Sequence, residues 1–440
     1  MSSKSNRSTL LVKNVIASFF IRGWLAIVVL LMVPLTLKML GVYTNGIWLT
    51  ISGILVWIDM LDIGLGNGLR NAVAESVALG DTENVRKAVS STFFMLVVVI
   101  APILLVLCCI IHFFDMYSAL GIDSHYITQL KTILTVAVII SCSTFILKVV
   151  GNFYMGLQLP AINNLIQCIG YTLALLLTAI AYYAGSHSLF VVVVINTASP
   201  LLVWMFSIPY TFGIKYPQYR PAFHYVNLKM VQSLCSSGFQ FFILQICSVI
   251  LFTSTNIIIS RIFSPAEVTP YQIAYRYFSI ILTVFTTICI PFWNATTDAY
   301  TTGDFVWIRK MGKKLDLVVV GSFICLVPMV LISGYVYKMW IGDGVHIPFS
   351  LSVSMAVYIF ILIASLRYSY ILNGINVLKI QLIFTIFATI VFLPLALLAC
   401  KSYGTVTSLV LVMCIVNIPG LIANMWKYRQ IFLKKNICKL

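Results

Sequence analysis

Charged side chains are scarce in this 440-residue chain: Asp, Glu, Lys and Arg make up 9% of it, whereas apolar residues make up 61%. The mean hydropathy is +1.02. Soluble domains carry about 25% charged residues, so the composition excludes an ordinary soluble domain. No hydrophilic stretch is long enough to hold a separate soluble domain between the apolar runs.

Cysteine pairs at metal-ligand spacing are also missing. The chain has 11 cysteines, but they form no CxxC motif and no Cys/His pair at the spacing of a zinc site. Most of them lie inside apolar runs, where cysteine behaves as a small hydrophobic residue. We therefore expect no disulfide framework, no metal site and no cofactor.

Apolar runs of about 20 residues, the length that a helix needs to cross a bilayer, recur along the whole chain. The first run, Val15–Leu37, is too long for the apolar part of a signal peptide and lacks a small-residue cleavage site, so we expect a retained span. The sequence predicts an all-α integral membrane protein with twelve transmembrane helices. The predicted spans are 14–38, 46–66, 89–112, 129–151, 160–184, 188–212, 232–260, 270–293, 315–338, 348–372, 377–400 and 405–427.

Basic residues are distributed unevenly between the two sides of these spans. The amino terminus, the carboxyl-terminal tail and every second connection, with their flanking residues, carry 20 of the 28 Lys and Arg. Because cytoplasmic loops hold the excess of Lys and Arg, we expect both termini in the cytoplasm. The formal net charge of +16 then indicates attraction to anionic headgroups rather than to nucleic acid.

A polar segment that follows the second span recurs in the second half of the chain. Residues 71–87 and 294–310, which are 223 positions apart, share six identities over 17 positions, including Gly80-Asp81 with Gly303-Asp304. Polar residues are rare in this chain, so these matches indicate an internal repeat, which sets the architecture. A weaker match, 218 positions apart, relates Met155–Gln158 to Asn373–Asn376.

The repeat predicts two lobes of six helices each. Because six is an even number of spans, both lobes insert in the same orientation, as in transporters built from parallel repeats. We expect an N-terminal lobe at 1–213, a cytoplasmic linker at 214–231 and a C-terminal lobe at 232–440.

Cations outnumber carboxylates inside the predicted spans. Arg22, Lys148, Arg276 and Arg367 lie in the first, fourth, eighth and tenth spans. An ionised side chain at the centre of a span costs about 2.5–3.5 kcal/mol on insertion scales, so these residues should face the protein interior, a watery cavity or one another. A positive cavity suits an anionic substrate, and the planar fork of arginine suits phosphate. Each of the four could instead extend to the headgroups or hold helices together.

Two carboxylates end the second span. Asp59 and Asp62 are three residues apart on one helix face and are followed by Arg70. They could form a proton or sodium site, or they could pair with Arg70 and Arg22 to close an inner gate. We expect no carboxylate within the spans of the second half.

Asp62–Asn71 (DIGLGNGLRN), followed by Ala74-Glu75, resembles the segment after the second helix of bacterial polysaccharide flippases. These are Wzx-type O-antigen and capsule transporters of the multidrug/oligosaccharidyl-lipid/polysaccharide (MOP) superfamily. The resemblance implies a MATE-like fold and a flippase that carries undecaprenyl-diphosphate-linked oligosaccharide across the bacterial inner membrane by alternating access. It also implies diphosphate contacts from Arg22 and Arg276, no enzymatic activity, and transport driven by a proton or sodium gradient or the membrane potential. A polysaccharide polymerase and a chain-length regulator are the partners it implies.

Two alternatives remain open at this point. A multidrug exporter of the same superfamily would expel organic cations, and its cavity should be rich in carboxylates. An integral-membrane polysaccharide polymerase or glycosyltransferase would present a long outer loop with catalytic residues. The longest outer loop here, at about 113–128, contains only Asp115 and Asp123 as carboxylates.

Overall fold

The computed structural model describes residues 2–59, 65–125, 127–228, 230–231, 247, 251, 254–301, 303–375 and 377–432. Regular structure within these ranges is helical, without a strand. The chain divides into two compact units, Met1–Phe242 and Ile243–Leu440, and we describe each by itself. The sequence-derived bounds of the two lobes and of the linker at 214–231 remain a proposal.

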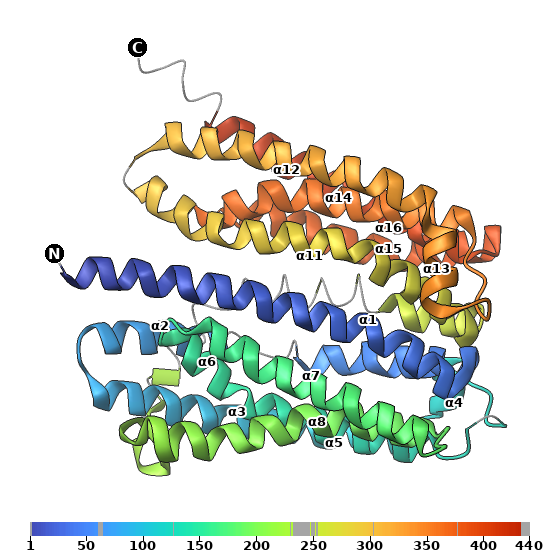
Figure 1. Ribbon diagram of the computed structural model, residues 1–440, viewed down its shortest axis with the longest axis horizontal. Coiled ribbons are helices and arrows are strands. Elements are labelled where there is room, and N and C mark those ends of the chain that lie inside the picture. Colours follow the sequence, from blue (N-terminus) through green and yellow to red (C-terminus); the bar gives the residue numbers. More distant parts are fainter. Residues whose placement is uncertain are drawn as a thin grey trace. The chain divides into compact units, whose positions relative to one another are not determined.

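The first unit begins with a long helix, α1 (Ser2–Asp59), which is interrupted at Gly41. Gly41 has a φ of 72°, a backbone conformation that residues with a side chain rarely adopt. α1 therefore contains the first predicted span, 14–38, and the part of the second up to Asp59, and the connection expected between them is a single kink. The elements that follow, coloured blue to green in Figure 1, are α2 (Leu65–Ala78), α3 (Thr82–Phe113), α4 (Met116–Leu120), α5 (Leu130–Leu147), α6 (Val149–Gly156), α7 (Pro160–Tyr183), α8 (Leu189–Pro209), η1 (Tyr210–Lys215), η2 (Pro217–Tyr219) and η3 (Phe223–Tyr225).

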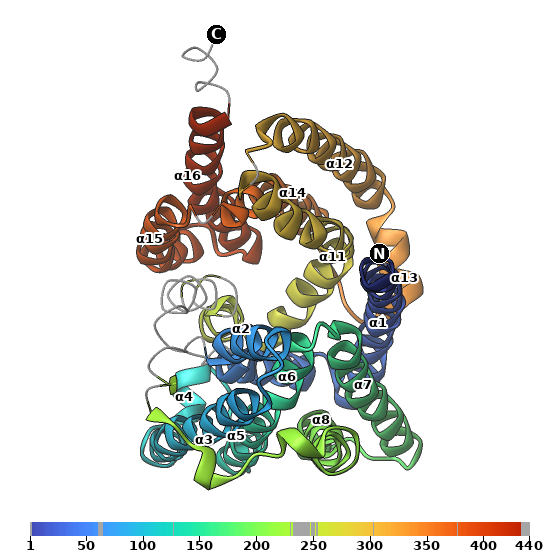
Figure 2. The ribbon, with the colours of Figure 1, turned by 90° about the vertical axis from the view of Figure 1, so that its left-hand side faces the viewer.

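The second unit is built around one central helix. Residues 254–262 are helical. They are followed by α11 (Pro265–Thr301), α12 (Phe305–Leu331), α13 (Ser333–Ile341), α14 (Phe349–Gly374), α15 (Lys379–Tyr403) and α16 (Val406–Phe432). α14 packs against α11, α12 and α16, and it is seen between α12 and α16 in Figure 2. It has buried residues on all its faces, which is why its apolar residues show no amphipathic pattern.

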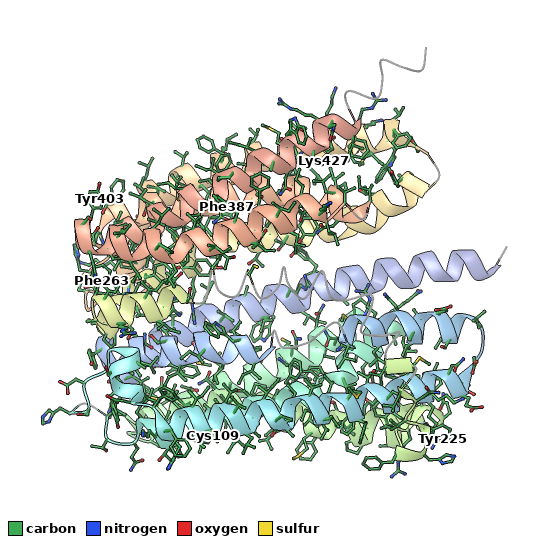
Figure 3. The ribbon with its side chains drawn as sticks, turned by 180° about the vertical axis from the view of Figure 1, so that it is seen from behind. Cys109, Tyr225, Phe263, Phe387, Tyr403 and Lys427 are labelled. Carbon is green, nitrogen blue, oxygen red and sulfur yellow. The ribbon has the colours of Figure 1, made fainter. Side chains whose placement is uncertain are left out.

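Ten helices in the described ranges are long and apolar enough to cross a membrane. α1 is one of the ten although it covers the first predicted span and most of the second, and the seventh predicted span, 232–260, lies largely outside the described residues. Large apolar side chains cover the outer surface, including Phe387 on α15, and Cys109 on α3 also points outward (Figure 3). A helix that exposes apolar groups and satisfies its own backbone hydrogen bonds suits a lipid environment. The prediction of an all-α integral membrane protein is confirmed.

Each unit has two ends, which Figure 3 labels. In the first unit Tyr225 and Cys109 lie towards opposite ends, and in the second Lys427 and Tyr403 do. α3 starts at the Tyr225 end, and α12 starts at the Lys427 end, where Phe305 contacts Phe432 with ring centroids 6.4 Å apart.

The internal repeat has the same local structure in both units. Gly80 and Gly303 have φ values of 72° and 77° and end one helix, and the next residue, Asp81 or Asp304, caps the following helix. A carboxylate oxygen of each aspartate accepts a backbone N–H 2.9 Å away, from Asn84 in α3 and Trp307 in α12. A left-handed glycine followed by a capping aspartate reverses the chain without leaving helix-end groups unpaired.

The second match, 218 positions apart, is also a repeated structure. α6 ends at Gly156 and α14 ends at Gly374. The N–H of Leu159 donates to the carbonyl of Tyr154 at 2.9 Å, and the N–H of Val377 donates to the carbonyl of Leu372 at the same distance. Each unit therefore turns between its fourth and fifth predicted spans in the same way.

Replacing either capping aspartate with alanine should destabilise its unit. Asp81→Ala and Asp304→Ala each remove a side-chain cap, which lowers the free energy of unfolding by about 1 kcal/mol. Thermal unfolding of the purified protein in detergent should show a lower midpoint for both variants. Glu75→Ala, which changes an exposed carboxylate on α2, serves as the control and should leave the midpoint unchanged.

Candidate functional site

Arg22 lies on α1, eight residues inside the predicted span 14–38, a helix length of about 12 Å. Its side chain is partly exposed. Within the described ranges, no residue forms a hydrogen bond or ion pair with its guanidinium. Two residues further on, the indole N–H of Trp24 donates to Thr172 of α7 at 3.1 Å and fixes this part of α1. An unpaired guanidinium at this depth needs water or an anionic ligand.

Arg276 lies on α11 of the second unit, partly exposed and 11 residues after the first helical residue, Pro265. Its backbone carbonyl accepts the hydroxyl of Ser279 at 3.0 Å. α11 packs along α14, the central helix of this unit. Arg22 and Arg276 thus belong to different units, each on a long apolar helix.

Lys148 lies at the break between α5 and α6, where it is the C-terminal cap of α5 and the N-terminal cap of α6. Its carbonyl accepts N–H groups from Gly151 at 2.9 Å and Asn152 at 3.3 Å. The fourth predicted span therefore has two segments, with a cation at their junction.

Arg367 is buried in the second unit, with 4% of its side chain exposed, and it pairs with a carboxylate of the same unit. Its Nε lies 2.6 Å from Oδ1 of Asp316 in an ion pair, and its Nη2 donates a hydrogen bond to Oδ2 at 2.9 Å, so both carboxylate oxygens contact the guanidinium. The carbonyl of Gly312 accepts a further bond from Nη2 at 3.2 Å. The guanidinium carbon also lies 4.2 Å from the ring centroid of Tyr368 and 4.4 Å from that of Tyr428. These contacts join α12, α14 and α16 and give Arg367 a structural role.

Asp316 corrects one expectation. The second half was expected to hold no carboxylate within its spans, yet Asp316 lies in α12 and within the predicted span 315–338. Its side chain is 52% exposed, while its charge is compensated by Arg367. The sequence carried a signal for it, because Asp316 is one of only 12 acidic residues and lies at the start of an apolar run.

Asp59 and Asp62 lie near the end of the second predicted span, and the described residues include only the first of them. Asp59 is the last residue of α1, but its side chain is not described, and Asp62 lies outside the described residues. Arg70 is exposed on α2. A close packing of α2 on α6 places the carbonyl of Arg70 beside Gly156, where an added Cβ would lie 2.9 Å from it. The pairing of these carboxylates with Arg70 or Arg22 stays a prediction.

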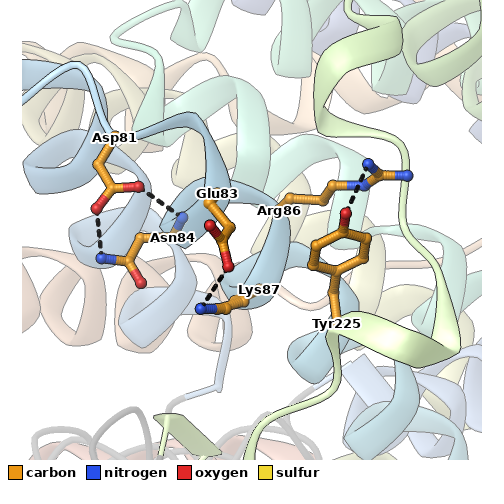
Figure 4. A network of polar contacts seen from close by, with 6 residues as sticks. All are labelled: Asp81, Glu83, Asn84, Arg86, Lys87 and Tyr225. Carbon is orange, nitrogen blue, oxygen red and sulfur yellow. Dashed lines mark hydrogen bonds and ion pairs between the residues drawn. The ribbon is translucent and has the colours of Figure 1, made fainter.

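The segment 216–227, which follows the last span of the first unit, is bound along α3 (Figure 4). Arg86 donates to the carbonyl of Arg220 at 2.9 Å and to the hydroxyl of Tyr225 at 3.2 Å, and it lies over the Tyr225 ring at 4.2 Å. The hydroxyl oxygens of Ser90 and Ser91 accept the backbone N–H groups of Ala222 at 3.1 Å and Asn227 at 2.9 Å. Sequence reasoning placed Arg86 in the repeat but found no role for either serine, because serine has no distinctive signal in an apolar run.

The interior of the second unit holds polar side chains that pair across helices. The amide nitrogen of Gln272 on α11 donates to Asn256 at 2.7 Å, and that of Gln381 on α15 donates to Asn373 on α14 at 3.0 Å. Such bonds compensate the cost of polar groups in lipid. Within the described ranges, no group of three or more His, Cys, Asp or Glu side chains could hold a metal ion.

The fold is that of a MATE transporter. The chain aligns with an inward-facing structure of a multidrug resistance MATE family transporter of the MOP superfamily at a TM-score of 0.79, covering 94% of this chain and 96% of that one with 14% identity. An outward-facing structure gives a TM-score of 0.69 over 96% and 95% of the two chains, also with 14% identity. A Vibrio cholerae MATE transporter gives 0.65 over 98% and 99%, with 12% identity. At these identities the likeness shows the fold alone.

The chain belongs to the polysaccharide biosynthesis protein family, whose profile matches residues 11–290. It is 24% identical over 365 residues to a Salmonella typhi protein named "Putative O-antigen transporter", with 80% of each chain covered. Both findings agree with the resemblance noted in the sequence: the chain is a membrane protein of the polysaccharide biosynthesis family that has the fold of a MATE transporter.

Removing only Asp316 from its pair with Arg367 should destabilise the protein more than removing both charges. Asp316→Ala leaves a buried guanidinium without its carboxylate and should lower the free energy of unfolding by about 2 kcal/mol. This loss is smaller than that for a fully buried pair because Asp316 is half exposed. The double variant Asp316→Ala/Arg367→Met should regain part of that loss. Unfolding midpoints of the single and double variants measure this coupling. Equal midpoints for Asp316→Ala and the wild type would contradict it.

Arg86→Ala should release segment 216–227 from α3. The substitution removes two hydrogen bonds and a ring contact, so amide hydrogen exchange in this segment should rise roughly tenfold. Lys87→Ala is the matched control, because among the described residues the ion pair of Lys87 is with Glu83 of the same helix at 2.8 Å, and Lys87 donates no hydrogen bond to the segment. If the two variants exchange alike, Arg86 does not hold the segment.

Proposed function

We propose that this protein is a flippase that moves undecaprenyl-diphosphate-linked oligosaccharide from the inner to the outer leaflet of the bacterial inner membrane. Membership of the polysaccharide biosynthesis family supports the substrate class. The fold supports a transporter that alternates between inward- and outward-open states, since transporters built from two parallel repeats work in this way. The chain would perform no covalent chemistry.

One observation supports an anionic substrate group in particular. Arg22 lies inside a span with no partner for its guanidinium in the described ranges, whereas Arg367 is neutralised by Asp316. A diphosphate presents planar pairs of oxygens that a guanidinium binds with two hydrogen bonds. We assign Arg22 to the diphosphate, and we propose Arg276 of the second unit and Lys148 as further cations that bind it. Arg367 is left out of this assignment.

The proposed route follows from the cost of burying charge. A diphosphate cannot cross hydrocarbon without a polar path, while a polyprenyl chain is as apolar as the lipid around it. The charged head and its sugars would therefore pass through the protein while the tail stays in the bilayer. Asp59, Asp62 and Arg70 would form a gate or an ion-coupling site, and a proton or sodium gradient or the membrane potential would drive the cycle.

The topology proposed for this route follows from charge. The basic connections and both termini would face the cytoplasm. The Tyr225 end of the first unit and the Lys427 end of the second unit would then be the cytoplasmic ends, where the substrate enters. A polymerase and a chain-length regulator would act on the product at the opposite face.

Arg22→Ala should weaken binding of a polyprenyl diphosphate by about tenfold to hundredfold, the effect of losing hydrogen bonds to a charged group. Arg22→Lys should fall between it and the wild type, because it keeps the charge but loses the fork. Binding can be measured with the purified protein and a labelled polyprenyl diphosphate, with the polyprenol alone as the uncharged ligand.

Arg429→Ala, at an exposed position of α16, is the control and should bind as the wild type does. If Arg22→Ala unfolds at the same temperature as the wild type and still binds the diphosphate tightly, Arg22 is not part of the site.

A further inference from the structure

α12 carries a stripe of exposed residues that changes from basic to apolar along one face. Lys310, Lys313, Leu317 and Val320 are all exposed and follow the spacing of three and four residues that keeps side chains on one side of a helix, and the exposed Val306 precedes them by one turn. Leu317 is 73% exposed and Val320 54%. Lys310 and Lys313 therefore lie where the lipid-facing surface of this helix reaches the Lys427 end of the unit, with Lys314 beside them.

The equivalent face of α3 in the first unit is covered by protein. Lys313, Lys314 and Leu317 correspond, 223 positions earlier, to Ser90, Ser91 and Phe94. Both serines are buried and accept backbone N–H groups from segment 216–227, and Phe94 contacts Phe223 with ring centroids 6.1 Å apart.

The same helix face is thus covered by segment 216–227 in the first unit and exposed in the second. In the second unit the two serines are replaced by lysines, which offer no acceptor to a covering backbone. Within the described ranges, no residue pairs with Lys310, Lys313 or Lys314. The acidic side chains of α12 do not compensate them, since Asp304 caps the helix and Asp316 pairs with Arg367.

We propose that this face of α12 binds the headgroups of anionic phospholipids through Lys310, Lys313 and Lys314. The lysines lie at the headgroup level of a helix whose next turns face the acyl chains, and each supplies a charge and up to three hydrogen-bond donors to a lipid phosphate. The site is a contact of the second unit with its bilayer. It is separate from the diphosphate site proposed on Arg22, and it does not depend on the transported substrate.

The carboxyl-terminal tail is the other occupant to consider, because the segment after the sixth span covers the equivalent face in the first unit. Residues 433–440 read LKKNICKL and contain three lysines and no acidic residue. Like charges repel, so this tail is poorly matched to a face that presents three lysines. Charge complementarity therefore favours lipid phosphate.

To test the proposal, phosphatidylglycerol is added in increasing amounts to the full-length protein in neutral detergent, and the thermal unfolding midpoint is measured at each concentration. Phosphatidylcholine is the neutral lipid, and inorganic phosphate is the free anion. The wild type should be stabilised by phosphatidylglycerol alone, and added salt should weaken the effect. In the triple variant Lys310→Gln/Lys313→Gln/Lys314→Gln, the phosphatidylglycerol concentration that gives half of the rise in midpoint should increase roughly 100-fold. Each lysine near an anionic surface contributes about fivefold to the affinity. If the triple variant does not fold, Lys310→Gln and Lys313→Gln should each show about a fivefold rise.

The control replaces three exposed cations elsewhere in the second unit, as Lys379→Gln/Lys401→Gln/Arg429→Gln. It should titrate as the wild type does. An unchanged titration of the lysine variants, an equal loss in the control, or an equal effect of inorganic phosphate would each overturn the proposal. A disulfide formed between Lys313→Cys and the native Cys438, mapped by mass spectrometry, would assign the face to the tail instead.

Discussion

The absence of water from the bilayer core is the constraint on which the rest of this structure depends. Every backbone group in a span must be paired within its helix, and every charge needs a partner or a path to water. Arg367 meets this requirement through Asp316 of α12 and the rings of Tyr368 and Tyr428. Arg22 has no such partner among the described residues. That contrast separates a cation that holds helices together from one whose charge is not compensated within the described part of the chain.

The two units share two short structural motifs but little extended sequence similarity. A left-handed glycine and a capping aspartate precede the third and the ninth predicted spans, and an equivalent turn follows the fourth and the tenth. Where the repeat has diverged, the surroundings of the shared helix face differ. Ser90 and Ser91 hold the segment after the sixth span, whereas Lys313 and Lys314 face outward.

The all-α membrane architecture could be predicted from the sequence because apolar length is a strong signal in a membrane protein, and the MATE-like fold was implied by the resemblance of Asp62–Asn71 to polysaccharide flippases. The repeat was visible because polar residues are rare, so Gly80-Asp81 and Gly303-Asp304 were unlikely to match by chance. The partner of Arg367 was not predicted, because Asp316 is 51 positions away in sequence and only the packing of α12 on α14 brings them together. The kink at Gly41 was missed for a different reason, since a single left-handed glycine can replace a loop.

The central claim is that an oligosaccharide linked to a polyprenyl diphosphate crosses the membrane through this protein. Proteoliposomes containing the wild-type protein and a labelled polyprenyl-diphosphate oligosaccharide test it most directly, with a membrane-impermeant glycosidase added outside. We expect the fraction of label that the glycosidase can reach to rise above that of protein-free vesicles, with no efflux of an organic cation from the same preparation. Cation efflux with no change in glycosidase access would contradict the account and indicate a multidrug exporter.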